Sequence, residues 1–186
     1  ACRLLQPSSS NLMTLIHEKK QGPDRSVVLV AGDFLAPSLL SSLDKGSSMV
    51  DMLNRLGVEY VCFGNHESDV PLSALKQRIE QSQFTWINTN MRELDQQLNV
   101  ETPEYCILSV KSKRIALLGL LTDDKGLYRP GAFGNAKIEP TIDATQRVLR
   151  ELSNVDLVVP LTHQAMEDDR KYAAAVDNLP IICGGH

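Results

Sequence analysis

The hexapeptide Gly64-Asn65-His66-Glu67-Ser68-Asp69 directly follows the apolar run Tyr60-Val61-Cys62-Phe63. A strand therefore ends in a tight turn that carries an amide, an imidazole and two carboxylates. Packing does not require Asn65 and His66 side by side, whereas a metal site combines a neutral oxygen ligand with a proton-transfer group. The alternative is an ordinary turn in which the glycine supplies the bend and Asp69 caps the next helix.

The composition predicts one domain of an ordinary globular protein. The chain has 186 residues, of which 42% are hydrophobic and 23% charged, enough for a single sizeable core. The formal net charge of -4 gives no basic footprint, so we expect no nucleic acid partner. No apolar run reaches the length of a membrane span and no signal peptide is visible, so we expect no membrane partner.

The cysteines favour a reducing compartment, and we therefore expect a cytoplasmic location. None of the four forms a Cys-x-x-Cys pair, and three lie inside apolar runs. Buried, reduced thiols fit this pattern better than a disulfide framework or a zinc knuckle. The four residues are Cys2, Cys62, Cys106 and Cys183.

The pattern along the chain predicts alternating helices and strands, with one interruption. A first helix carries Leu12, Leu15 and Ile16 at helical spacing and is expected to pack that face inward. The runs at 104–110 and 114–120 are separated by three polar residues and predict a β-hairpin, which makes the sheet system mixed. The segment 122–140, rich in Gly and Pro, is predicted to be a long loop, functional or mobile.

Potential ligands follow four separate predicted strands. If these strands share a sheet edge, their ends converge on one point, as ligand sites do at the carboxyl ends of strands. A lone His at a strand end is more often structural than a ligand, but three of the four histidines occupy equivalent places. The mixture of oxygen and imidazole groups suits zinc, manganese or iron in a catalytic site. The residues are Asp33, Asn65, His66, His163 and His186.

The order of these motifs resembles the signature of the calcineurin-like metallophosphoesterases, and most closely their 5′-nucleotidase branch. The matching motifs are Gly32-Asp33, Gly64-Asn65-His66-Glu67 with Asp69, then His163, and finally Gly184-Gly185-His186. The resemblance covers nearly the whole chain. It implies an α/β fold of two mixed β-sheets packed face to face with helices outside, a four-layer α/β/β/α sandwich. Residues 1–186 would form a single metallophosphoesterase catalytic domain, truncated at both ends.

The resemblance also implies a role for each residue. His66 would face the phosphate, where it stabilises the transition state or protonates the leaving oxygen, and Asp69 would orient its ring. Two divalent ions would serve the complete enzyme, with Mn, Zn, Fe and Mg all open, and Asp33 would bridge them. The implied metal ligands are Asp33, Asn65, His163 and His186.

Two departures from the family pattern limit what the chain is expected to do. The family's first motif, Asp-x-His, normally lies ahead of the position where this sequence begins, and the sequence offers no substitute, since His17 lies inside the first predicted helix. The last motif usually continues to another ligand two residues after the position of His186, where this sequence ends. We therefore expect these 186 residues to bind at most one metal ion tightly and to turn over slowly.

The sequence supports a metal-dependent phosphoester hydrolase acting on a small phosphorylated substrate. With 5% aromatic residues there is no evident nucleoside clamp, so a nucleotide, a sugar phosphate and a phosphorylated glycosyl-glycerate all stay open. The alternative is a catalytically impaired relative that binds a phosphorylated ligand or has a regulatory role. The presence of both His66 and Asp69 favours the enzyme, because a binding protein has little need of a positioned proton donor. The oligomeric state is left open.

Overall fold

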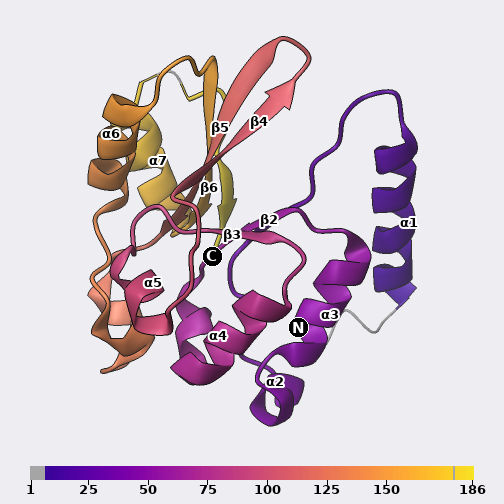
Figure 1. Cartoon of the computed structure of the whole chain (residues 1–186), viewed down its shortest axis with the longest axis vertical. Coiled ribbons are helices and arrows are strands. Elements are labelled where there is room, and N and C mark those ends of the chain that lie inside the picture. The colour runs from indigo at the N-terminus through magenta and orange to yellow at the C-terminus, as the bar shows by residue number, and fades with distance from the viewer. Residues whose placement is uncertain (1–6, 178) are drawn as a thin grey trace.

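The computed structural model describes residues 7–177 and 179–186 and shows two β-sheets packed face to face (Figure 1). The first sheet is parallel, in the order β1 (Leu29–Ala31), β2 (Tyr60–Cys62), β3 (Thr85–Ile87). The second has the order β4 (Tyr105–Val110), β5 (Lys113–Leu121), β6 (Leu157–His163), β7 (Cys183–Gly185). Its first pair is antiparallel and its other pairs are parallel. The predicted hairpin and a mixed sheet are confirmed, but only the second sheet is mixed, whereas the first is parallel throughout its described strands and not mixed as the resemblance implied.

Helices cover both outer sides of the sheets, so the four-layer sandwich is also confirmed. Buried side chains of α3 and α4 join the core beneath the first sheet, and those of α6 and α7 pack on β5. Figure 1 shows these two groups of helices on separate sides of the molecule. The helices are α1 (Pro7–Gln21), α2 (Leu39–Asp44), α3 (Ser47–Leu56), η2 (Asn65–Asp69), α4 (Leu72–Gln81), α5 (Glu93–Leu98), η3 (Lys125–Leu127), η4 (Ala132–Asn135), α6 (Thr141–Glu151) and α7 (Met166–Ala175).

The layer between the sheets contains the thiols that the sequence predicted to be reduced. Cys62, Cys106 and Cys183 are free and join one apolar cluster with Ile87 and Leu117. Burial raises the pKa of Cys62 well above its ordinary value and that of Cys106 to about 11. Neutral thiols in this layer act as small apolar side chains. The fourth cysteine lies outside the described residues.

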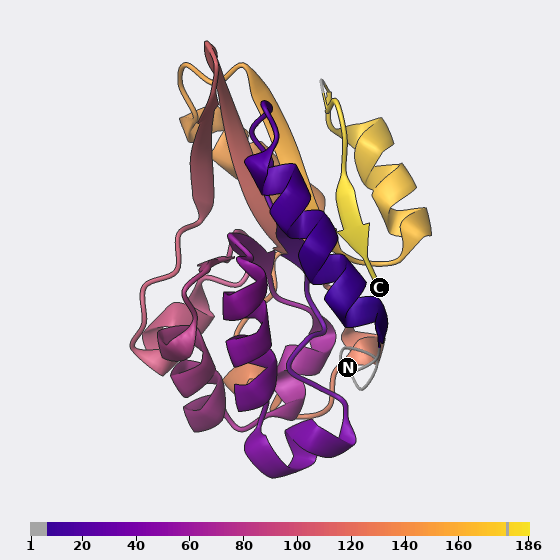
Figure 2. The ribbon, with the colours of Figure 1, turned by 90° about the vertical axis from the view of Figure 1, so that its right-hand side faces the viewer.

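Helix α1 corrects the expected packing of its apolar face. Leu12 is 40% exposed and Leu15 50% exposed, whereas Ile16 packs against the core. Polar contacts fix the far end of the helix, because Lys20 Nζ donates to the Gly57 carbonyl oxygen over 2.7 Å. Figure 2 shows α1 running along one side of the sandwich. The helix was predicted correctly, but the prediction that it packs this face inward was wrong.

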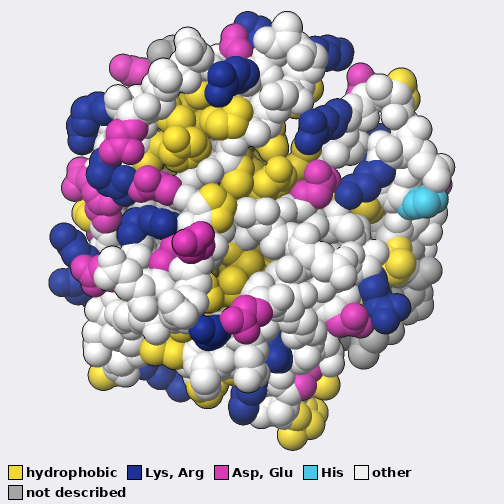
Figure 3. Space-filling model, viewed as in Figure 1, with side chains coloured by type: hydrophobic (Ala, Val, Ile, Leu, Met, Phe, Trp, Pro, Cys, Tyr) yellow, Lys and Arg dark blue, Asp and Glu magenta, His cyan; other side chains and the backbone are white. Residues whose placement is uncertain are grey.

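A second group of apolar side chains is exposed on α2. Leu39 and Leu43 are 79% and 78% exposed, and Leu40 is 43% exposed. Figure 3 shows hydrophobic surface at the lower end of the molecule, where α2 lies in Figure 1. Among the helices of the described residues, none is long and apolar enough to cross a bilayer.

The polar segment after β3 joins the two sheets. Asn90 donates through Nδ2 to the carbonyl oxygens of Leu121 and Glu139, over 2.7 and 2.8 Å, and accepts from the Leu121 amide over 3.0 Å. Thr89 donates to the Glu104 carbonyl oxygen and accepts from the Gly119 amide. These buried side chains satisfy backbone groups where β3 leaves the first sheet.

The sheets approach most closely where Gly119 of β5 faces Ile87 of β3. A Cβ atom at position 119 would collide with the Ile87 backbone, with its carbonyl carbon only 2.8 Å away. We expect Gly119→Ala to lower the free energy of unfolding by about 1 to 3 kcal/mol, because backbone cannot move aside as a side chain can. Urea unfolding measures this. Gly126→Ala, in exposed η3, is the control, and an equal loss in both variants would contradict the close approach of the sheets.

Candidate metal and phosphoester site

The strand ends bring the predicted site residues together from two sheets, not from one sheet edge. Asp33 follows β1 and η2 follows β2 in the first sheet, while His163 ends β6 and His186 follows β7 in the second. A hydrogen bond of 2.6 Å joins His163 Nδ1 to the Ala31 carbonyl oxygen and so connects the sheets. The strand ends were expected to converge at the edge of one sheet. They converge because the two sheets pack face to face.

Two glycines allow this close approach. Gly32 has a φ of +70°, and a Cβ atom there would lie 2.6 Å from Gly64 Cα and 2.7 Å from His163 Nδ1. A Cβ atom at Gly64 would collide with the side chain of Asp33. Only residues without a side chain let the two strand ends and the imidazole pack this tightly.

Glu67, which sequence reasoning left without a role, shapes the loop that carries Asp33. Its fully buried carboxylate accepts backbone hydrogen bonds from Asp33 (2.8 Å), Phe34 (2.9 Å), Leu35 (3.0 Å) and Gly64 (2.6 Å). Asp33 has a φ of +55°, an uncommon conformation for a residue with a side chain. The four bonds hold the loop in that conformation. The signal in the sequence was an acidic residue directly after the Asn-His pair.

The carboxylate of Asp33 is oriented by both of its oxygen atoms. Oδ1 accepts from the backbone amide of His66 over 2.9 Å, and Oδ2 lies 3.2 Å from His163 Nε2. Burial acts to raise the pKa of Asp33, but hydrogen bonds and charge from His163 and His66 outweigh it and lower the pKa below its ordinary value. Asp33 is therefore held as a carboxylate beside the buried imidazole.

Electron pairs from three side chains converge at His163 Nε2. A carbonyl oxygen only accepts hydrogen bonds, so His163 Nδ1 must carry the hydrogen that meets Ala31. In the neutral ring, Nε2 then presents a lone pair to Asp33 Oδ2 at 3.2 Å and to Asn65 Oδ1 at 3.1 Å. Burial lowers the pKa of His163, but Asp33 and the Ala31 carbonyl outweigh this and raise it overall. The two oxygen atoms therefore favour positive charge at this nitrogen.

The donor set fits a divalent metal ion. Ligands that each lie about 2.1 Å from one ion are roughly 3.0 to 3.4 Å apart, which agrees with both distances at His163 Nε2. Its Nδ1 hydrogen bond also fixes the ring as metal-binding histidines require. Among the described residues no three His, Cys, Asp or Glu side chains form such a cluster, and here the amide of Asn65 completes the set.

His186 lies next to this group without joining it. Its ring centroid is 5.2 Å from that of His163, with the two rings nearly perpendicular at 88°. It has a φ of +121°. The structure therefore brings together Asp33, Asn65 and His163 and places His186 beside them.

His66 is held by Asp69, the contact that the sequence predicted. His66 Nδ1 lies 2.7 Å from Asp69 Oδ2, and the His66 side chain is 40% exposed. A carboxylate accepts, so Nδ1 carries the hydrogen and leaves Nε2 for another partner. The next helix, α4, begins after Pro71, whose position shows no side-chain cap. The contact with His66 therefore describes Asp69 better than helix capping does.

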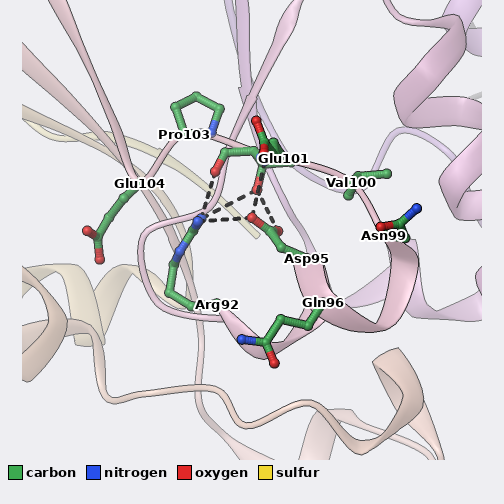
Figure 4. A pocket seen from close by; sticks show the side chains of 9 residues that line it. Arg92, Asp95, Gln96, Asn99, Val100, Glu101, Pro103 and Glu104 are labelled. Carbon is green, nitrogen blue, oxygen red and sulfur yellow. Dashed lines mark hydrogen bonds and ion pairs between the residues drawn. The ribbon is translucent and has the colours of Figure 1, made fainter.

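A cavity of about 900 Å³ beside α5 is lined by one arginine, which is tied into a hydrogen-bonded network (Figure 4). Arg92 forms an ion pair with Asp95 over 3.0 Å and donates to the carbonyl oxygens of Asn88 and Thr102. Asp95 also accepts from the amide and the hydroxyl of Thr102. This network ties α5 to the segment before β4 and leaves the cavity without a free cationic side chain among the described residues.

The class that this fold and site define is shown by comparison with known proteins. The sequence pattern of the family described as "Calcineurin-like phosphoesterase" matches residues 5–186. The chain belongs to the calcineurin-like phosphoesterase family. Its fold, the order of its motifs and its joined strand ends agree with that assignment.

Within the family, the relatives include 5′-nucleotidases. The chain is 29% identical over 150 residues to Protein UshA of Yersinia enterocolitica, covering 72% of this chain and 27% of that protein. It is 25% identical over 184 residues to the 5′-nucleotidase of Bos taurus, covering 95% and 32%. The chain thus spans about a third of the length of these relatives.

Solved structures agree on the fold. The 5′-nucleotidase precursor from Thermus thermophilus superposes with a TM-score of 0.82 at 22% identity, covering 94% of this chain and 35% of that one. The NAD nucleotidase NadN of Haemophilus influenzae also gives 0.82, at 24% identity, covering 96% and 32%. At these identities the likeness concerns the fold.

Proposed function

We propose that the protein is a metal-dependent phosphomonoesterase of the 5′-nucleotidase type, with a dinuclear centre in the complete enzyme. The observation that carries the proposal is the convergence of Asp33, Asn65 and His163 next to a separate His66–Asp69 pair. One group of residues suits a cation and the other suits proton transfer, which is the division that phosphoester hydrolysis needs.

Two groups of residues would divide the work of metal binding and proton transfer. Asp33, Asn65 and His163 would bind the ion, with His186 nearby as a further ligand. Bound divalent ions supply positive charge that stabilises phosphoryl oxygens and lower the pKa of water. His66 keeps its Nδ1 hydrogen on Asp69, so a second proton taken up by the ring would sit on Nε2. From there it could pass to the oxygen of the leaving group, which would leave the ring neutral. Manganese and zinc suit the mixture of oxygen and imidazole ligands.

Hydrolysis of 4-nitrophenyl phosphate tests the proposal. We expect the 186-residue chain to release nitrophenol with manganese and not with excess EDTA. Asp33→Asn should lower kcat/KM by about 100-fold or more, because it removes the charge that attracts the ion. His17→Ala, which changes an exposed histidine on α1, should leave the rate unchanged. Equal rates with manganese and with EDTA would contradict a metal-dependent enzyme.

Calorimetric titration with manganese gives a second readout that needs no turnover. We expect one tight site and at least a tenfold weaker dissociation constant in His163→Ala, since even supporting residues change metal affinity by about 10- to 100-fold. His17→Ala is again the control. Two tight sites would refute the expectation of a single one. Metal binding without hydrolysis would support the alternative, a relative that binds a phosphorylated ligand.

A further inference from the structure

The loop from Thr122 to Pro140 lines two cavities, and the smaller of them reaches Asp69 of the His66–Asp69 pair. The smaller, of about 300 Å³, lies between η2 and the loop and is lined by Asp69, Gly131 and Phe133. The larger, of about 630 Å³, lies within the loop and is also lined by Gly131 and Phe133. Gly131 and Phe133 line both cavities, which are here named together the loop trough, and the smaller one is also lined by Asp69, the residue that holds His66.

The floor of the loop trough is aromatic and fixed in place. The Tyr128 hydroxyl donates to the Thr122 carbonyl oxygen over 2.5 Å, and its ring centroid lies 6.2 Å from that of Phe133. Phe133 is buried and packs edge to face on Phe63, the residue before Gly64. The trough is therefore anchored to the strand end that carries the site, and its position relative to His66 is fixed by packing.

The wall of the larger cavity carries an excess of positive charge. Lys125, Arg129 and Lys137 line it together with one carboxylate, Asp123. Within the described part of the chain, none of these three cationic side chains forms an ion pair or a hydrogen bond. The cavity beside α5 differs, because its Arg92 is paired with Asp95. Three unpaired cations against one carboxylate in the lining favour an anionic ligand in this cavity.

We propose that the loop trough binds the leaving group of the substrate, and that Lys125 and Arg129 recognise a second anionic group on it, a carboxylate or a phosphate. The inference rests on the proposed function, which places the scissile bond next to His66. The preferred substrates would then be phosphomonoesters of acidic alcohols or of alcohols that carry a second phosphate. Neutral alcohol phosphates would bind more weakly.

Matched pairs of ligands test this. The pair 3-phosphoglycerate and glycerol 3-phosphate differ by a carboxylate, and the pair fructose 1,6-bisphosphate and fructose 6-phosphate differ by a phosphate. We expect the more acidic member of at least one pair to bind about tenfold more tightly in calorimetry, since each exposed ionic contact contributes up to about fivefold. The pair with the larger ratio identifies the second group. The preference should shrink as salt rises from about 20 to 300 mM, because exposed charges are screened.

The double variant Lys125→Gln/Arg129→Gln should abolish the preference. The control is Lys111→Gln/Arg150→Gln, which removes the same charge from exposed positions. Lys111 lies in the hairpin turn at the start of β5, roughly 25 to 30 Å from the loop at the other end of that nine-residue strand. Circular dichroism would verify that both variants are folded.

The outcomes separate this inference from the proposed function. A preference that is lost only in Lys125→Gln/Arg129→Gln supports the loop trough even if the chain hydrolyses nothing. Equal affinities within both pairs, or a preference that persists in that variant, overturn the loop trough as a subsite. Hydrolysis of 4-nitrophenyl phosphate with manganese would then still support the phosphoesterase.

Discussion

His66→Ala is expected to lower kcat for phosphomonoester hydrolysis by about 100-fold or more, the scale of general acid catalysis. The side chain is partly exposed, and the bond that His66 donates to Asp33 comes from its backbone amide. The substitution therefore removes the imidazole without removing the contact that orients the carboxylate. Stopped assays of inorganic phosphate release with manganese measure the change.

The leaving group distinguishes the two roles that His66 could have. If His66 protonates the leaving oxygen, the loss should be larger for an alkyl phosphate, whose alkoxide is a poor leaving group, than for 4-nitrophenyl phosphate. If His66 instead stabilises the phosphoryl oxygens, kcat should fall by the same factor for both substrates. Asp69→Asn should lower kcat less than His66→Ala but with the same dependence on the leaving group, because it weakens the contact that orients the His66 ring.

The control for His66→Ala is a measurement of manganese binding, which needs no turnover. The manganese affinity of His66→Ala should equal that of the unchanged chain, since the converging donors belong to Asp33, Asn65 and His163. A variant that keeps its metal and also keeps its full rate on both substrates would contradict a catalytic role for His66.

Glu67→Gln is expected to lower the free energy of unfolding by about 2 to 4 kcal/mol although it preserves the shape of the side chain. Each carboxylate oxygen accepts two backbone hydrogen bonds. In Gln, an NH₂ group replaces one carboxylate oxygen, so its N–H groups would face two backbone N–H groups and no acceptor. Each buried polar group left without a partner costs about 1 to 3 kcal/mol. Urea unfolding measures the loss.

The same variant should also weaken manganese binding. The loop of residues 33–35 is held by Glu67, and Asp33 needs its left-handed conformation to face His163. Glu101→Gln, at an exposed position, is the matched control and should change stability by less than about 0.5 kcal/mol. If Glu67→Gln unfolds no more easily than Glu101→Gln, the carboxylate does not hold the loop.

The strands and the metal-ligand candidates could be predicted because their signals are local. Continuous apolar runs mark β1, β2 and β6, and polar residues directly after them mark the strand ends. The hairpin between β4 and β5 follows from two apolar runs and a short polar turn. That two sheets exist was implied by the family resemblance alone, because periodicity does not tell which strands pair.

Two features escaped prediction because they depend on partners far along the chain. Leu12 and Leu15 have helical spacing, but their exposure depends on where α1 lies, which its own pattern does not determine. Glu67 would ordinarily be solvated, and its burial makes sense only once the amides of residues 33–35 are placed around it. The roles of individual ligands stay predictions until metal binding is measured.

The bond between Ala31 and His163 also has a consequence for the order of events during synthesis. The two residues are 132 positions apart in the chain. At a synthesis rate of about 5 to 20 residues per second, the ribosome adds His163 roughly 7 to 26 s after Ala31. During that interval the loop of residues 33–35 can form around Glu67 in the nascent chain. The cation site cannot form, because His163 has not yet been added. Metal should therefore load late, after the second sheet has closed over the first.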